Sequence, residues 1–256
     1  MQSNSLSLIN LEDVSRLPFN NFKHFLNHYN FDVDFFSGVQ DVDSLIGGNC
    51  IFKSRLAAEI LEQTYSKVSC VVEIGGFHHA IIASDENLGM VFYDSCLYMP
   101  HALGLKSDFE CMPTMFADMY GDVNFVAVDL GGPLSTQVVW KYSSLGVSRS
   151  FTFNYDLLET NQISFNDFEV EPFKTVPKAL IFRYLTVNNQ LMHLSFFVQD
   201  KVCVLSRAFS RDFVFVSQLS VDQKSQFIQD VGLDVLVLEG LMHKACEFML
   251  LSKRDV

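Results

Sequence analysis

The sequence Ile46-Gly47-Gly48-Asn49-Cys50 runs directly into a segment, residues 51–65, with the pattern of an amphipathic helix. In that segment apolar residues recur at spacings of three and four, and charged residues stand between them. The two glycines permit a tight bend just before the helix. A cysteine at a helix start lies near unpaired backbone N–H groups and the positive end of the helix dipole, which favour a thiolate. Cys50 is therefore a candidate nucleophile. The structural alternative is that the Cys50 side chain only packs against its neighbours and that the glycines only form the end of the helix.

A nucleophilic cysteine needs a base, and the base needs a group that orients it. His78 and His79 open an apolar strand-like segment, and Asp94 closes the next one. A hairpin that turns between residues 86 and 87 places His79 directly opposite Asp94, with Cβ atoms about 4.5–5.5 Å apart. That distance allows a hydrogen bond between an imidazole and a carboxylate. We therefore expect Cys50, His79 and Asp94 to act together as a catalytic triad.

The choice between the two neighbouring histidines depends on the register of this hairpin. Successive residues of a strand point to opposite faces, so His78 points away if His79 faces Asp94. A bulge at Gly89 would shift the register by one residue and favour His78 instead.

Composition and charge narrow the class of protein. Of the 256 residues 49% are apolar, and 25 are Phe, which is typical of a folded globular chain. The formal net charge of -12 repels phosphate backbones and anionic membranes, so neither nucleic acid nor a membrane is an expected partner. Residues 1–11 lack the basic start and apolar core of a signal peptide. We expect a cytoplasmic protein.

The six cysteines and the remaining histidines give no metal or disulfide pattern. The cysteines are scattered, form no Cys-x-x-Cys pair, and are expected to be free thiols in a reducing compartment. His24 and His28 are four residues apart and could share a helix face, but no third ligand accompanies them. No metal site is expected.

Three regions differ in pattern. Residues 1–66 are helical in character; residues 67–175 alternate with period two, which predicts an antiparallel sheet that closes toward a barrel; residues 176–256 carry three strands and then two helices. The strands are predicted at 68–74, 79–84, 90–94, 123–130, 137–142, 148–155, 179–186, 191–198 and 202–206. Ser220 is predicted to cap the first C-terminal helix, with Gln223 completing a capping box, and the second helix is predicted at 236–251.

Short motifs of the chain resemble the arylamine N-acetyltransferase family. Leu17-Pro18-Phe19-Asn20-Asn21-Phe22 is similar to the family's Ile-Pro-Phe-Glu-Asn-Leu, and residues 46–50 resemble its Arg-Gly-Gly-aromatic-Cys motif. Asp94 follows His79 at the family's spacing. Asn20 and Ile46 replace an ion pair of the family together, so no unpaired buried charge is left. Asp94-Ser95-Cys96-Leu97 stands where the family has Asp-Val-Gly-Phe, close to its acceptor pocket.

The resemblance implies an α+β fold: an N-terminal helical bundle over 1–66 that supplies the Cys, an antiparallel β-barrel over 67–175 that supplies His and Asp, and an α/β lid over 176–256. It implies an acyltransferase that moves an acyl group from a thioester, acyl-CoA or an acyl carrier protein, through acyl-Cys50 to a small-molecule amine. These donors are co-substrates, and no permanently bound cofactor is expected. Two alternatives stay open: a cysteine hydrolase with the same triad, either a peptidase or an amidase, and a non-catalytic binding module with this fold.

Overall fold

The structure, a computed structural model, describes residues 10–23, 26, 45, 47–72, 78–105, 110–111, 123–129, 135–144, 147–156, 177–208 and 210–251. The chain divides into two compact units, and each unit combines two separate pieces of sequence. The first unit joins Met1–Arg16 to Cys50–Phe168, and the second joins Leu17–Asn49 to Glu169–Val256. The predicted ranges 1–66, 67–175 and 176–256 do not coincide with these units, and the division into three domains stays a prediction.

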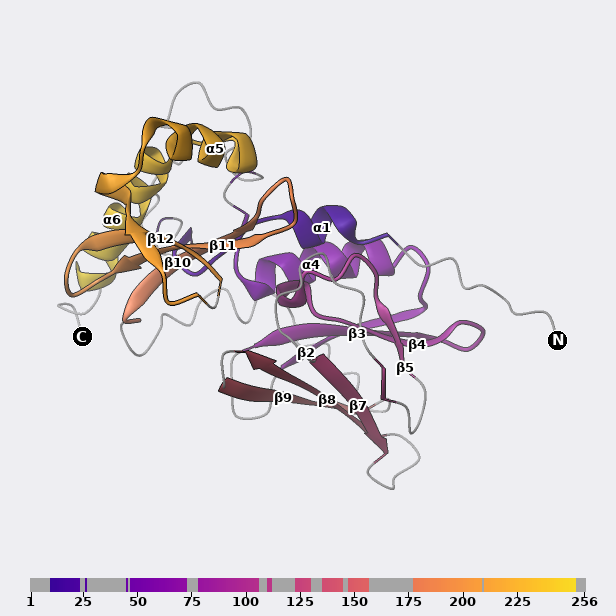
Figure 1. Ribbon diagram of the computed structural model, residues 1–256. Coiled ribbons are helices and arrows are strands. Elements are labelled where there is room, and N and C mark those ends of the chain that lie inside the picture. The colour runs from indigo at the N-terminus through magenta and orange to yellow at the C-terminus, as the bar shows by residue number, and fades with distance from the viewer. Residues whose placement is uncertain are drawn as a thin grey trace. The chain divides into compact units, whose positions relative to one another are not determined.

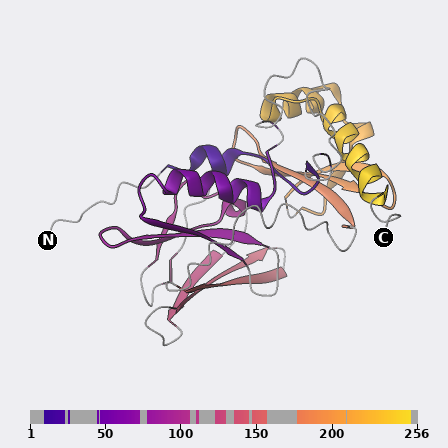
Figure 2. The same ribbon diagram turned by 180° about the vertical axis from the view of Figure 1, so that it is seen from behind.

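The first unit is layered, with helices over one antiparallel sheet and a second antiparallel sheet beyond it (Figures 1 and 2). The helices are α1 (Glu12–Arg16) and α4 (Cys50–Leu61), with a short 3-10 turn η2 (Ser95–Leu97). The sheet next to them has the order β2 (Lys67–Val72), β3 (His79–Asp85), β4 (Gly89–Tyr93) and β5 (Leu103–Leu105). The other sheet has the order β6 (Glu110–Cys111), β7 (Val123–Asp129), β8 (Ser135–Ser144) and β9 (Val147–Asp156).

The strands expected for a barrel are present, but among the described residues they form two separate sheets. The strands predicted at 68–74, 79–84 and 90–94 correspond to β2, β3 and β4 of one sheet. Those predicted at 123–130, 137–142 and 148–155 correspond to β7, β8 and β9 of the other. Among the described residues, these two sheets do not close on each other through strand pairing. The prediction of mixed helix and antiparallel sheet is therefore confirmed, and no closed barrel is found in the described part of the chain.

Helix α4 carries Cys50 as its first residue, as the sequence predicts. It ends at Leu61 instead of the predicted residue 65, because residues 62–64 form a turn in which Thr64 N–H donates to the Leu61 carbonyl. Its buried face consists of small residues and one Leu, together with Lys53. Small side chains such as Ala57 and Ala58 let the helix approach β2 and β3 closely. In this way α4 brings its N-terminus to the sheet that carries the histidines.

A buried polar cluster joins α1, α4 and the segment after β4. Lys53 is fully buried, and its Nζ donates to the Ser15 carbonyl at 3.2 Å and lies 4.4 Å from the centre of the Tyr98 ring. The Ser15 hydroxyl donates to the Met99 carbonyl, so the Tyr93 hydroxyl donates to Ser15 Oγ, 2.7 Å away. Because a buried ammonium without partners would be strongly destabilising, these contacts fix how α4 packs against the segment that begins at η2.

The second unit packs two helices against a five-stranded antiparallel sheet. The sheet has the order β1 (Phe19–Asn20), β10 (Ala179–Leu185), β11 (Leu191–Phe197), β12 (Val202–Arg207) and β13 (Phe213–Phe215). The turn η4 (Val216–Gln218) leads to α5 (Val221–Val231), and α6 (Val235–Leu251) packs against α5 and β11. The core lies between sheet and helices and includes Phe182, Phe196, Phe227, Leu238 and Met242. The strands predicted at 179–186, 191–198 and 202–206 are confirmed within one residue at each end.

The C-terminal helices begin as the sequence predicts. Ser220 caps α5, because its Oγ accepts from Gln223 N–H and the Gln223 side chain accepts from Ser220 N–H in return. Helix α6 begins one residue before the predicted 236 and ends at the predicted 251. In the described part of the chain, no helix is both long enough and apolar enough to cross a membrane.

The motif at residues 17–22 is hydrogen-bonded to this sheet through β1 and through the side chain of Asn21. Asn21 acts as a clamp on β10: its Oδ1 accepts from Ile181 N–H at 2.7 Å and its Nδ2 donates to the Ala179 carbonyl at 3.3 Å. Asn20 is buried, and its Oδ1 accepts from the N–H groups of Phe22 and Lys23. The motif is therefore structural in this chain, and its amides satisfy backbone groups that would otherwise be buried without partners.

The glycine pair before Cys50 packs against the same motif. Gly48 N–H donates to the Pro18 carbonyl at 3.2 Å, Asn20 N–H donates to the Gly48 carbonyl at 3.0 Å, and Lys23 Nζ donates to the Gly47 carbonyl at 3.1 Å. Gly47 has φ +67°, and a Cβ at this position would lie 2.0 Å from the Pro18 carbonyl oxygen. Both the backbone conformation and the close approach require glycine here. The path of the chain into Cys50 is thus fixed by backbone contacts.

Gly47→Ala is expected to destabilise the second unit more than Gly232→Ala. Both glycines have positive φ, for which a side chain costs about 1–2 kcal/mol. At Gly232 a new Cβ would meet only the flexible end of the Leu45 side chain, whereas at Gly47 it would meet backbone. Urea unfolding followed by circular dichroism measures both losses. Equal losses would contradict the close packing at Gly47.

Candidate active site

The hairpin between β3 and β4 decides which histidine meets Asp94. Ile81 pairs with Tyr93, and Asp85 pairs with Gly89, so three residues form the loop and Gly89 takes a left-handed conformation with φ +81°. Three-residue hairpin loops that end in a left-handed glycine are common. The register therefore differs by one residue from the predicted one, in which the chain turns between residues 86 and 87.

The shift reverses the roles of the two histidines. Successive side chains of a strand point to opposite faces of the sheet. A shift of one residue in the register therefore exchanges the two sets of side chains, so that His78 takes the face expected for His79. The structure joins Asp94 to His78, with 2.6 Å between His78 Nε2 and Asp94 Oδ2. The predicted placement of His79 opposite Asp94 is wrong, and the alternative in which Gly89 shifts the register describes the geometry.

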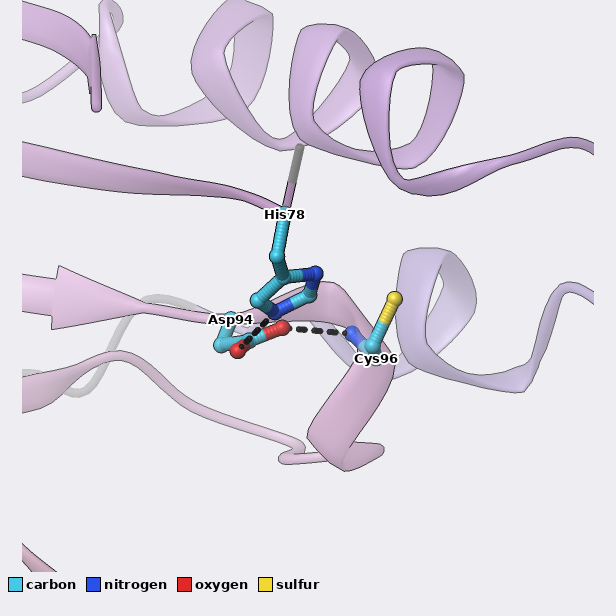
Figure 3. Close-up of side chains that lie close together, drawn as sticks. All are labelled: His78, Asp94 and Cys96. Carbon is cyan, nitrogen blue, oxygen red and sulfur yellow. Dashed lines mark hydrogen bonds and ion pairs between the residues drawn. The ribbon is translucent and has the colours of Figure 1, made fainter. Parts of the chain in front are cut away.

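Asp94 is held from two sides (Figure 3). Its side chain is fully buried, with Oδ2 bonded to His78 and Oδ1 accepting from Cys96 N–H at 2.9 Å. Asp94 is also the N-terminal cap of η2, and its carbonyl accepts from Leu97 N–H. A buried carboxylate requires such donors. The turn that follows β4 therefore orients the carboxylate, and the carboxylate in turn orients the imidazole.

Cys50 completes the group from the first turn of α4. Its side chain is hydrogen-bonded to His78. Since His78 Nε2 is bonded to Asp94, the nitrogen left for Cys50 is Nδ1. The thiol, the imidazole and the carboxyl group thus form one chain of hydrogen bonds, the order in which a nucleophile, its base and an orienting group are arranged. All three residues belong to the first unit.

His78 has an unusual protonation equilibrium. Burial lowers the pKa of its imidazole, but the charge of Asp94 and the hydrogen bonds to Asp94 and Cys50 outweigh it and hold this pKa well above 6.5. A histidine whose pKa is raised by folding stabilises the folded state at low pH, and the contribution is lost as pH rises through the folded pKa. Asp94 and Cys50 therefore both favour the protonated form of His78.

His79 lies in a different environment. It is buried, and its Nδ1 is 3.4 Å from the sulfur of Cys70, a diagonal neighbour on β2. Burial first, and then the charge of His78, lower the pKa of His79 to about 4. Burial likewise raises the pKa of the Cys70 thiol to about 12. His79 is therefore neutral at neutral pH and fills the interior of the sheet.

Sequence patterns did not single out two residues near this group. Cys96 has its thiol beside His78 and Asp94: the ligand atoms of the three lie within 4.8 Å of one another. Ser95 is fully buried, and its hydroxyl has no hydrogen-bond partner among the described residues. The signals in the sequence were their closeness to Asp94 and the departure of residues 94–97 from the family's Asp-Val-Gly-Phe. His24, His28 and Ile46, considered in the sequence, lie outside the described residues.

Comparison with known proteins supports the fold. No protein-family profile matches the sequence, and no curated protein matches it. Among solved structures, arylamine N-acetyltransferase of Mycobacterium smegmatis is 13% identical with a TM-score of 0.52, over 93% of this chain and 90% of that one. A variant of the Mycobacterium smegmatis enzyme with a cysteine replaced by glutamine is 12% identical, with a TM-score of 0.54 over 93% and 90%. Arylamine N-acetyltransferase of Nocardia farcinica is 15% identical, with a TM-score of 0.51 over 92% and 86%.

The chain therefore has an arylamine N-acetyltransferase-like fold over nearly its whole length. The resemblance found in short sequence motifs is confirmed at the level of the fold. At 12–15% identity, the similarity to those enzymes concerns the fold.

Nuclear magnetic resonance of the histidine side chains should distinguish the two neighbours. At pH 7 His78 should give the signals of an imidazolium and His79 those of a neutral ring, because their pKa values are shifted in opposite directions. In Asp94→Asn the largest cause that raises the pKa of His78 is removed, and this pKa should fall. A His78 that titrates at its ordinary value in the wild-type protein would contradict the pairing with Asp94.

Proposed function

We propose that this chain is an acyltransferase that works through an acyl-Cys50 intermediate, with His78 as the base and Asp94 as the orienting group. The observation that supports it most is the hydrogen-bonded chain from Cys50 through His78 to Asp94, with 2.6 Å between His78 Nε2 and Asp94 Oδ2. The fold, similar to that of arylamine N-acetyltransferases, supports acyl transfer over other cysteine chemistry.

In the first half-reaction His78 starts in its protonated form, with one proton on Nδ1, and the Cys50 sulfur attacks the carbonyl carbon of a thioester as a thiolate. The tetrahedral adduct expels the donor's thiolate, which takes the proton from His78. Asp94 stabilises the imidazolium while it exists and fixes the orientation of the ring. The products are acyl-Cys50 and a free thiol.

In the second half-reaction an amine attacks the carbonyl carbon of acyl-Cys50. His78 accepts the proton that the amine loses and returns it to the departing sulfur. The products are an amide and the free Cys50 thiol. No permanently bound cofactor is needed, because the thioester carries the acyl group in an activated form. Acyl-CoA and acyl carrier protein thioesters are the proposed donors, and small amines are the proposed acceptors, in a reducing cytoplasm that keeps the thiols free.

Cys50→Ala should abolish acyl capture, whereas Cys70→Ala should keep it. Both residues are thiols in the same unit, but only Cys50 is hydrogen-bonded to His78, while Cys70 faces His79. Intact mass after incubation with a panel of acyl-CoA and acyl-carrier thioesters measures the adduct. A full adduct on Cys50→Ala would remove the nucleophile from the proposal.

The same experiment separates transfer from the alternatives. Release of the acyl group only when an amine is added supports transfer, and release into water alone supports a hydrolase. If no thioester labels Cys50, and iodoacetamide alkylates it at the rate of an ordinary thiol, the chain is a binding module with this fold.

His78→Gln should lower the single-turnover acylation rate far more than His79→Gln. Removal of a general base costs roughly 10²–10⁴-fold. Replacement of His79 disturbs a buried contact with Cys70 and should act mainly on stability. Acylation rates per folded molecule, with the folded fraction taken from circular dichroism, measure the difference. The reverse order of effects would mean that His79 is the base.

A further inference from the structure

Cys96 is a second thiol beside the His78–Asp94 pair, and acyl transfer makes no use of it. Its backbone N–H donates to Asp94 Oδ1, which fixes the residue at the start of η2. The ligand atoms of Cys96, His78 and Asp94 all lie within 4.8 Å of one another. Figure 3 shows the Cys96 sulfur on the side of the imidazole ring whose nitrogen does not face Asp94.

That nitrogen, Nδ1, is also the one available to Cys50. Nε2 is hydrogen-bonded to Asp94 at 2.6 Å, so the hydrogen bond between Cys50 and His78 involves Nδ1. The two thiols also act on each other electrostatically: burial raises the pKa of the Cys96 thiol to about 12, and a charge on Cys50 is among the further causes that raise it. Cys50 and Cys96 therefore both lie close to the same imidazole, Cys50 through a hydrogen bond and Cys96 with ligand atoms within 4.8 Å.

We infer that Cys50, Cys96 and His78 Nδ1 form a binding site for Zn²⁺, with Asp94 as the carboxylate that orients the histidine. Two thiolates and an imidazole suit Zn²⁺ and exclude the oxygen-preferring Mg²⁺ and Ca²⁺. Histidines that bind zinc usually donate their other ring N–H to a carboxylate, and His78 Nε2 has that partner. Three protein ligands leave a fourth position open to water or to an added thiol.

Zn²⁺ bound at this site is coordinated by the sulfur of Cys50, the atom that captures the acyl group. Coordination displaces the protons of both thiols and the proton on His78 Nδ1, and these protons pass to water. Cys50 can then no longer attack a thioester, and His78 can no longer accept a proton at Nδ1. The bound ion thus blocks acyl capture reversibly, and removal of the ion by a chelator restores it.

Co²⁺, a coloured substitute for Zn²⁺, tests the site on the reduced full-length protein. Binding through two thiolates should produce sulfur-to-cobalt absorption in the near ultraviolet and strong visible bands of a four-coordinate ion, and Zn²⁺ should displace both. Cys96→Ala should weaken Co²⁺ binding at least ~10-fold, since even the loss of an outer partner costs ~10–100-fold. Cys70→Ala is the matched control and should bind Co²⁺ like the wild type.

Wild-type protein without sulfur-to-cobalt absorption would overturn the site, and so would unchanged affinity in Cys96→Ala. Loss of Co²⁺ binding in Cys70→Ala together with normal binding in Cys96→Ala would also overturn the site, because the second sulfur ligand would then be Cys70 of β2. If Cys96→Ala does not fold, Cys96→Ser, of similar size, takes its place. The spectra are independent of acyl transfer: a protein that binds Co²⁺ through two thiolates but captures no acyl group retains the metal site and loses the proposed enzyme activity.

Discussion

The buried carboxylate of Asp94 is the constraint on which the arrangement of the site depends. A charge in the interior needs donors, and Asp94 has one on each oxygen: His78 Nε2 and Cys96 N–H. The first bond requires a particular register between β3 and β4, and the second requires the chain to turn into η2 directly after β4. The packing of α4, with its buried Lys53 bonded to α1, then determines where Cys50 lies relative to the imidazole. The hairpin and the turn thus position the two donors of the Asp94 carboxylate, and the helix positions Cys50 beside the histidine that this carboxylate orients.

Much of this arrangement could be predicted from local patterns. Cys50 begins a helix, and Ser220 and Gln223 form a capping box. Each of the nine predicted strands is present with its ends within two residues of the prediction, whereas the short strands β1, β5, β6 and β13 were not predicted. These features depend on a few neighbouring residues, so a single sequence contains the information. The role of Asp94 as the partner of a histidine also follows from its distance along a hairpin.

The misplaced histidine shows where local patterns are insufficient. Loops of two and three residues both suit the sequence between Asp85 and Gly89, and only the left-handed conformation of Gly89 distinguishes them. A difference of one residue there exchanges His78 and His79 at the site. Whether strands close into a barrel depends on contacts between distant segments, which the periodicity of a sequence does not show. Lys53 is one of the charged residues that stand between the apolar positions of α4, yet it is buried, because its partners, Ser15 and Tyr98, come from other elements.

The pairing of β1 with β10 has a consequence for the order in which the protein folds on the ribosome. Asn21 and the residue it clamps, Ile181, are 160 positions apart, and at ~5–20 residues per second that separation takes roughly ten to thirty seconds to synthesise. During this interval β1 has no strand to pair with, while the contacts of Pro18 with the glycines at 47 and 48 can already form. The second unit can therefore close only late in synthesis, and its early segment remains available to chaperones until then.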